Sequence, residues 1–180
     1  MDRVPSPSPE ILQRAAQISV LLLDVDGVLT DGKIVYAEYG DELKAFDVQD
    51  GAGLVAWHQA GLKSAIITSR QSRIVKRRAK ELRIHFLEQG SHDKRRMFER
   101  MLRKLRVTRA QVCVVGDDIL DLPMLRQAGL SVAVSNAVPD IKQTCHYVTQ
   151  RPGGQGAVRE VIELILKAKG LWDGILAQYL

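Results

Sequence analysis

Short apolar runs alternate along the chain with stretches in which apolar residues recur at helical spacing. The apolar runs predict strands over residues 20–25, 63–68, 85–87, 112–116, 131–134 and 147–148. The helical stretches predict helices over residues 53–60, 72–82, 94–105, 122–128 and 157–169. Short strands separated by helices imply an α/β fold, with a mostly parallel sheet covered on both faces. We therefore expect a Rossmann-like three-layer sandwich.

One segment departs from this alternation directly after the first predicted strand. Residues 33–36 and 42–46 are short β-like runs on either side of Tyr39-Gly40-Asp41. This arrangement predicts a projecting β-hairpin over about residues 33–46. Such a hairpin is either decoration, a cover for a site at the strand end, or a contact with another subunit.

The two ends of the chain differ in composition. Residues 1–9 are rich in proline and serine and lack the pattern of a signal peptide, so we expect residues 1–15 to form a flexible lead. Residues 16–180 then fit a single domain. The tail, residues 170–180, is apolar and docks either on its own chain or on a neighbouring one.

Composition narrows the class of protein. An apolar content of 46% and a charged content of 26% are ordinary for a soluble globular protein. No apolar run approaches the ~20 residues of a membrane span, so we expect no membrane partner. Cys113 and Cys145 lie in or near apolar runs and indicate buried thiols in a reducing compartment. We therefore expect a cytoplasmic protein.

The net charge of +5 comes from lysines and arginines clustered in residues 70–83 and 94–109. Nucleic-acid binding is one explanation. Aromatic residues make up only 5% of the chain, however, and no nucleic-acid motif is present. Solvated helix faces are the favoured interpretation, and attraction of a small acidic substrate is also compatible. We therefore expect no nucleic-acid partner.

The first candidate site follows the first predicted strand. Asp24 and Asp26 stand where this buried strand surfaces, and Gly27 lets the chain turn away. Ligands of open α/β sheets bind just outside the carboxyl ends of strands. Two carboxylates there can bind a hard cation, attack an electrophile and transfer protons. A strand followed by a plain Asp-Gly turn has the same pattern.

Two further candidates carry a hydroxyl and a cation. Thr68-Ser69-Arg70 follows the second long strand, where a hydroxyl and free backbone N–H groups suit an oxyanion such as phosphate. The same pattern fits a helix N-cap. Lys94 opens a predicted helix, which is unremarkable alone. It gains weight because Asp24 and Asp26 need a fixed cation to offset their charge.

A second acidic cluster follows the strand over residues 112–116. Asp117, Asp118 and Asp121 repel one another unless a cation or a donor lies among them. Acidic residues at a helix N-terminus are the alternative explanation. Two acidic clusters at two strand ends favour Mg²⁺, which prefers oxygen ligands.

Taken in this order, these four motifs resemble those of the haloacid dehalogenase-like phosphohydrolases from about residue 20 to the C-terminus. The resemblance implies that Asp24 attacks phosphorus to form an aspartyl-phosphate and that Asp26 transfers protons. It implies a Mg²⁺ site formed by Asp24, the backbone carbonyl of Asp26, and Asp117. It also implies that Thr68 and Lys94 bind the phosphoryl oxygens, and that Asp118 or Asp121 orients Lys94 or a metal-bound water.

Within this superfamily, residues 24–32, 47–51, 116–123 and 153–160 are most similar to phosphatases of 3-deoxy-D-manno-octulosonate 8-phosphate. This resemblance implies a sugar-acid phosphate substrate in lipopolysaccharide precursor synthesis. The substrate-binding residues it implies are Asp26, Asp47, Val48, Gln49, Asp50, Gly51, Arg70, Arg78 and Lys94. Ser69 and Arg151 are implied as supporting residues.

Alternatives to this substrate follow from two departures. Gln49 and Val55 stand where such relatives carry basic residues, so 3-deoxy-nononate 9-phosphate is an alternative ester, although Arg70 favours the octulosonate. Another alternative is a non-catalytic oligomerisation domain, as in some sialic-acid-activating enzymes. Retention of the acidic and phosphate-binding residues argues against that role.

Spacing excludes a cap domain. Only 43 residues separate Asp24 from Thr68, and only 25 separate Thr68 from Lys94. The resemblance implies that a homotetramer closes the site instead, with hairpins meeting around an axis and a neighbour's C-terminal segment covering the cleft. Arg151 and residues 153–156 are then expected near an adjacent site.

Overall fold

Six apolar runs lie side by side in one sheet. In the computed structural model, which describes residues 7–38, 40 and 42–180, the strands are β1 (Val20–Leu23), β4 (Lys63–Thr68), β5 (Phe86–Gln89), β6 (Val112–Gly116), β7 (Leu130–Ala133) and β8 (Tyr147–Val148). Their order is β5-β4-β1-β6-β7-β8, and every neighbouring pair is parallel. In the middle, Leu22 of β1 lies opposite Ala65 and Val114. Burial on both faces explains why the central strands β1 and β6 are continuous apolar runs.

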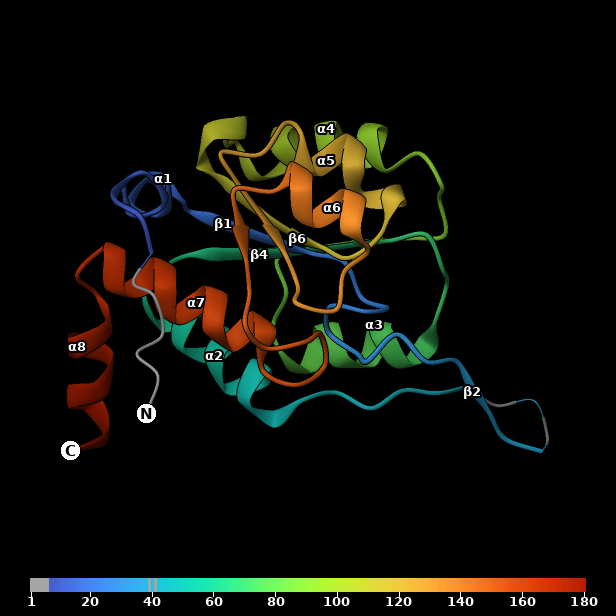
Figure 1. Cartoon of the computed structure of the whole chain (residues 1–180). Helices are drawn as coiled ribbons and strands as arrows, with labels where there is room; N and C mark the ends of the chain where they lie inside the picture. Colours follow the sequence, from blue (N-terminus) through green and yellow to red (C-terminus); the bar gives the residue numbers. More distant parts are fainter. Residues whose placement is uncertain (1–6, 39, 41) are drawn as a thin grey trace.

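Helices cover both faces of this sheet. They are α1 (Pro9–Gln17), α2 (Val48–Gln59), α3 (Arg73–Glu81), α4 (Lys94–Leu105), α5 (Leu122–Leu125), α6 (Pro139–Thr144), α7 (Ala157–Ala168) and α8 (Trp172–Leu176). Helices α4, α5 and α6 lie on one face, α2, α3 and α7 lie on the other, and α1 packs against α7 (Figure 1). The predicted three-layer α/β sandwich with a parallel sheet is confirmed.

The chain changes direction between β1 and β6. From β1 it runs outward through β4 to β5, and then returns on the other side of β1 to form β6, β7 and β8. The carboxyl ends of β1 and β6 therefore meet at a topological switch point, which is where open α/β sheets form ligand crevices. Both predicted acidic clusters follow these two strands.

The flexible lead expected for residues 1–15 is wrong for residues 9–15, which belong to α1. The Ser8 hydroxyl accepts a hydrogen bond from the N–H of Ile11, and Pro9 stands at the start of the helix. Serine before the helix and proline inside its first turn are strong start signals. Ile11 and Ala15 are buried, so packing holds this helix. Residues 1–6 of the expected lead lie outside the described residues.

The predicted hairpin is present. Its strands are β2 (Val35–Tyr36) and β3 (Glu42–Leu43), which pair antiparallel, and it projects beyond the sheet in Figure 1. The predicted turn residues Tyr39 and Asp41 lie outside the described residues. The hairpin and α2 occupy the interval between β1 and β4, which leaves no room there for a cap domain.

The C-terminal tail docks in part on its own chain. In α8, Trp172 and Ile175 are buried, and the Arg159 guanidinium lies 5.1 Å from the centre of the Trp172 ring. Tyr179 and Leu180, at the end of the tail, are exposed. Figure 1 shows α8 at the opposite end of the molecule from the hairpin. Docking of this exposed end on a neighbouring chain stays a prediction.

The two predicted buried thiols differ in exposure. Cys113 is buried and Cys145 is only partly buried, both are free, and burial raises the pKa of Cys113 far above its ordinary value. Throughout the described ranges, no helix combines the length and the apolar content needed to cross a bilayer.

The loop before α7 packs tightly on the loop after β1. The N–H of Gly154 donates to the carbonyl of Val28 at 2.9 Å, and the N–H of Gly153 donates to Asn136 Oδ1 at 2.8 Å. A Cβ on Gly153 would lie 1.7 Å from the Gly27 carbonyl oxygen. Only glycine therefore allows this approach of two backbones.

Gly153→Ala is expected to destabilise the fold by about 1–3 kcal/mol, because the two loops must separate. Urea unfolding followed by circular dichroism measures this change. Gly174→Ala is the matched control, because a Cβ at Gly174 in α8 meets no atom within 4 Å. The control is expected to be neutral or stabilising by up to about 1 kcal/mol. Equal stability of the two variants would contradict the close approach.

Candidate active site

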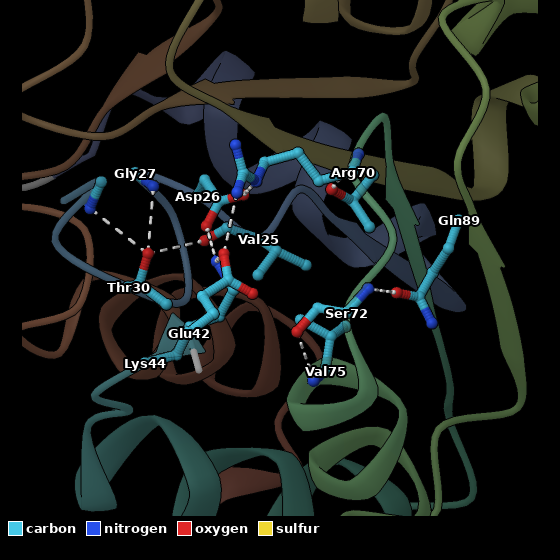
Figure 2. Close-up of polar contacts among 12 residues, drawn as sticks. Val25, Asp26, Gly27, Thr30, Glu42, Lys44, Arg70, Ser72, Val75 and Gln89 are labelled. Atoms are coloured by element: carbon cyan, nitrogen blue, oxygen red, sulfur yellow. Dashed lines mark hydrogen bonds and ion pairs between the residues drawn. The ribbon is translucent and has the colours of Figure 1, made fainter. Parts of the chain in front are cut away.

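A tight turn fixes Asp24 at the carboxyl end of β1. The Val25 carbonyl accepts hydrogen bonds from the N–H groups of Val28, Leu29 and Thr30. The buried Thr30 hydroxyl accepts from the N–H of Gly27 and donates to Val25 (Figure 2). With its backbone thus held, the Asp24 side chain is buried, although it lies at the carboxyl end of a strand.

Gly27 is where the two acidic loops meet. Its φ is +89°, in the region that favours glycine, and a Cβ there would lie 2.0 Å from Asp117 Oδ2. The Asp-Gly sequence after β1 is therefore more than an ordinary turn. It lets the loop after β6 bring Asp117 up to Asp24.

Three carboxylates gather at this point around one ammonium. Carboxylate oxygens of Asp24, Asp117 and Asp121 lie within 4.8 Å of one another. Lys94 Nζ, at the first residue of α4, lies 2.8 Å from Asp24 Oδ1 and 2.7 Å from Asp121 Oδ1. The other oxygen of Asp121 accepts from the N–H of Asp117 at 3.1 Å. Asp24, Lys94 and Asp121 are all buried, so their geometry is fixed by packing as well as by charge.

The charges in this cluster do not balance. Burial and the nearby Asp121 raise the pKa of Asp24 to about 7, although Lys94 opposes the shift. Burial, followed by Asp24 and Asp121, raises the pKa of Asp117 to about 7. Burial disfavours the charged form of Lys94, but contact with Asp24 and Asp121 raises its pKa above the ordinary value. A divalent cation would relieve the excess negative charge, and a donor set made only of oxygens fits Mg²⁺.

These groups line a cleft of about 230 Å³. Its lining residues are Asp24, Asp26, Gly32, Thr68, Ser69, Arg70, Lys94, Asp117, Asp118, Leu120 and Asp121. Thr68 ends β4 and is buried. The buried Ser69 hydroxyl oxygen has no hydrogen-bond partner in the described part of the chain, so it is available to a ligand.

The Asp26 carboxylate faces the hairpin rather than the acidic cluster. Its Oδ1 lies 2.5 Å from Lys44 Nζ, and its Oδ2 lies 3.7 Å from Arg70 Nε. Glu42 pairs with the same two cations, at 3.2 Å from Lys44 and 2.9 Å from Arg70. Figure 2 shows this ring of alternating charges, which we call the hairpin cluster.

Sequence reasoning missed Glu42 and Lys44. The signal was the period of two along residues 42–46, which places Glu42, Lys44 and Phe46 on one face. Phe46 packs against the core, so this is the inward face of the hairpin. An inward lysine beside an acidic residue indicates a buried ion pair.

The segment 47–51 lies outside the cleft lining. Asp47 caps α2 by accepting from the N–H groups of Gln49 and Asp50, and Val48 is exposed. Asp50 is buried, and its Oδ1 accepts from the N–H of Arg159 at 2.7 Å, which ties α2 to the first turn of α7. Burial raises the pKa of Asp50 to about 6. Within this chain Asp50 links α2 to α7, and it is not among the residues that line the cleft.

Two other predicted residues, Arg78 and Arg151, also lie outside the lining. The Arg78 guanidinium stands over the Phe46 ring at 5.5 Å, and a Cβ on Gly51 would lie 2.5 Å from its Nη2. Arg151 Nη1 donates to Gln49 Oε1 at 2.6 Å. Arg78 and Arg151 therefore group with the start of α2, as a second set of predicted residues beside the cleft set.

Of the two residues suggested to orient Lys94, only Asp121 contacts it within the described ranges. Asp118 is exposed, and its Oδ1 accepts from the N–H of Ile119 at 2.6 Å. The 3-10 segment Ile119–Asp121 turns the chain so that Asp121 faces inward while Asp118 faces the cleft mouth. The spacing of the two residues in the sequence does not distinguish them.

The amino-acid sequence is similar to a family of known hydrolases and to individual phosphatases. The profile of the haloacid dehalogenase-like hydrolases matches residues 84–162. The chain is 44% identical over 165 residues to 3-deoxy-D-manno-octulosonate 8-phosphate phosphatase of Yersinia pestis, which covers 92% of this chain and 88% of the relative. The Escherichia coli K12 phosphatase of the same name is 43% identical over 166 residues.

Solved structures agree with these relationships. A crystal structure of 3-deoxy-D-manno-octulosonate 8-phosphate phosphatase from Moraxella catarrhalis, in complex with magnesium ion, phosphate ion and KDO, has a TM-score of 0.92 and 44% identity, covering 95% of this chain and 98% of that one. The Yersinia pestis phosphatase structure has a TM-score of 0.91 and covers 92% of this chain and 90% of that one. The chain therefore belongs to the haloacid dehalogenase-like hydrolases, in the group that contains the 3-deoxy-D-manno-octulosonate 8-phosphate phosphatases.

Proposed function

We propose that this protein is a Mg²⁺-dependent phosphatase that hydrolyses 3-deoxy-D-manno-octulosonate 8-phosphate to the sugar acid KDO and inorganic phosphate. One observation carries the proposal: Asp24, Asp117 and Asp121 meet at the switch point of the sheet, where Lys94 contacts Asp24 and Asp121. Its relatives and structural neighbours of the same name support the choice of substrate. The proposed setting is lipopolysaccharide precursor synthesis in the cytoplasm.

Asp24 is the proposed nucleophile of the first step. A carboxylate oxygen of Asp24 bonds to phosphorus, the ester P–O bond breaks, and Asp26 gives its proton to the leaving sugar oxygen. Lys94, Thr68 and Ser69 line the cleft and are the proposed ligands of the phosphoryl oxygens. Mg²⁺ held by Asp24, the backbone carbonyl of Asp26, and Asp117 would neutralise charge on the transferred group.

The second step restores Asp24. A water oxygen bonds to phosphorus, Asp26 takes a proton from that water, and the bond between Asp24 and phosphorus breaks to release phosphate. Asp121 contributes by fixing Lys94, since it contacts the ammonium and the Asp117 backbone together. Positioning and charge neutralisation thus account for most of the chemistry, as in other phosphoryl transfers.

The sugar acid is proposed to extend from the cleft past Arg70. The Arg70 side chain is 41% exposed at the cleft mouth, and its planar fork suits a carboxylate. The segment 47–51 forms the start of α2, and Arg78 lies beside it. We propose that they make the second contact with the sugar acid. Gln49 is already paired with Arg151 in the free chain, so substrate contact there requires a change of partner.

We also propose a homotetramer in which hairpins meet and a neighbour's tail covers the cleft. The hairpin exposes Ile34, Val35, Tyr36 and Leu43, although apolar groups of this size gain by burial. The tail leaves Tyr179 and Leu180 exposed at the far end of the molecule from its own hairpin (Figure 1). This position supports the proposal that the tail covers the cleft of a neighbour rather than its own.

The proposed function predicts ester-specific, metal-dependent phosphate release. With Mg²⁺, kcat/KM for the octulosonate 8-phosphate is expected to exceed that for 3-deoxy-nononate 9-phosphate and for simple alkyl phosphates by at least about tenfold. EDTA is expected to abolish turnover, and added Mg²⁺ to restore it. Asp24→Asn serves as the control, with activity reduced by at least about a thousandfold in a folded protein. Faster turnover of the nononate ester would contradict the substrate, and an active Asp24→Asn would contradict the nucleophile.

Mg²⁺ affinity is expected to rise with pH. The raised pKa values of Asp24 and Asp117, about 7 in the metal-free protein, mean that protons compete with the ion below that pH. The Kd measured by calorimetry is therefore expected to fall by about tenfold or more between about pH 6 and about pH 8. Asp31→Asn, at an exposed carboxylate outside the cluster, should leave this dependence unchanged. A Kd that is constant over this range would contradict the electrostatic account.

Disrupting the exposed hairpin face is expected to break the assembly. Leu43→Asp places a charge on this face and should convert tetramers to smaller species in light scattering, while the melting temperature falls by only a few degrees. Val55→Asp, at an exposed apolar position on α2, is the control and should stay tetrameric. A monomeric wild-type protein would contradict the proposed assembly.

A further inference from the structure

The Lys44 side chain is buried and has no part in the mechanism described above. Its side chain is only 1% exposed, although it comes from a projecting hairpin. Lysine is almost never fully buried unless it is paired, because an unpaired buried ammonium loses its hydration. Here Nζ lies 2.5 Å from Asp26 Oδ1 and 3.2 Å from Glu42 Oε1.

The short hairpin depends on contacts with the rest of the protein for its stability. Strands β2 and β3 pair over two residues each, and Val35, Tyr36 and Leu43 are exposed. A two-stranded hairpin of this kind is marginal alone. In the described residues, Lys44 pairs with Asp26 in the loop after β1, and Glu42 pairs with Arg70 in the loop after β4. The same contacts therefore hold the hairpin and Asp26.

The two Asp26 oxygens face different surroundings. Oδ1 is taken by Lys44, which does not line the cleft, whereas Oδ2 faces Arg70, which does. The Arg70 contact is longer, at 3.7 Å, and that side chain is 41% exposed. Lys44 is therefore the partner that fixes the carboxylate, and it leaves Oδ2 turned toward the cleft.

We propose that Lys44 is a positioning residue that holds Asp26 for proton transfer to the leaving group. This inference rests on the proposed phosphatase activity. The hairpin cluster has two positive and two negative groups, so burying Lys44 adds no net charge beside the acidic cluster. With Oδ1 fixed, rotation of the Asp26 side chain is restricted, and Oδ2 stays within reach of the ester oxygen.

Leaving groups separate positioning of Asp26 from a general structural role. An alkyl ester needs a proton on its leaving oxygen, whereas p-nitrophenolate leaves without one. Loss of a well-placed Asp26 therefore slows the alkyl ester far more than p-nitrophenyl phosphate. Loss of the fold, of Mg²⁺ or of phosphate binding slows both substrates alike.

The test compares Lys44→Met with the wild type on the sugar-acid phosphate and on p-nitrophenyl phosphate. We expect kcat on the sugar-acid phosphate to fall by about 30- to 100-fold, with kcat on p-nitrophenyl phosphate and both KM values within about threefold. Lys33→Met is the matched control, since Lys33 is an exposed lysine that precedes the same hairpin and pairs only with Asp31 within the described ranges. It should leave both rates unchanged.

Two further variants keep the inference open to refutation. Lys44→Arg should recover at least about a third of the lost kcat, because it retains a buried cation. The double variant Glu42→Gln/Lys44→Met restores charge balance without restoring the Asp26 contact, so it should remain slow on the sugar-acid phosphate. Full recovery by the double variant would show that Lys44 only neutralises Glu42, and would overturn the proposal.

Equal losses on both substrates in a folded Lys44→Met protein, or no loss on either, would also overturn the proposal. Circular dichroism establishes folding, and Lys44→Gln replaces the methionine variant if that protein does not fold. If the wild type fails to hydrolyse the sugar-acid phosphate, the proposed substrate fails. The same rate ratio measured with glycerol phosphate still tests Lys44.

Discussion

Mutual repulsion among Asp24, Asp117 and Asp121 is the constraint on which the site depends. Lys94 is paired with Asp24 and Asp121, and burial together with repulsion among the carboxylates raises the pKa of Asp24 and of the partly buried Asp117 to about 7. The protein holds these repelling carboxylates together because parallel pairing fixes β1 and β6 side by side. Gly27 and Thr30 also close the loop after β1. An arrangement that is poor for the free chain is suited to a cation and a phosphoryl group, which supply the missing charge interactions.

The hairpin cluster solves a second electrostatic problem in a different way. Asp26 must lie near Asp24 without adding to the same repulsion. Its carboxylate turns away from the acidic cluster toward Lys44 and Arg70, and the charge of Glu42 balances those cations. Two neighbouring carboxylates thus occupy different environments, which is how one site can use one as nucleophile and the other for proton transfer. In the described part of the chain, the hairpin thus supplies the charged partners of Asp26.

Sequence reasoning succeeded where a single pattern controls the outcome. Apolar runs predicted the strands to within a residue or two at each end, because burial on both faces of a parallel sheet tolerates few other residues. It missed α1, since the proline and serine content of the first residues concealed the helix start at Ser8 and Pro9. It began α2 five residues late, because Gly51 and Gly53 look unlike a helix, whereas packing against Arg78 and α7 favours glycine there.

The pattern of residues alone placed Asp24 and Asp117 after strands, Thr68 at the end of a strand and Lys94 at the start of a helix, and parallel strands then bring their ends to one edge. The partners of each side chain depend instead on tertiary packing: Asp121 rather than Asp118 for Lys94, Arg159 for Asp50, and Lys44 for Asp26. The reason is physical. Local sequence sets backbone conformation and which face a residue occupies, but hydrogen bonds and ion pairs between residues 18 to 109 positions apart depend on how the layers pack.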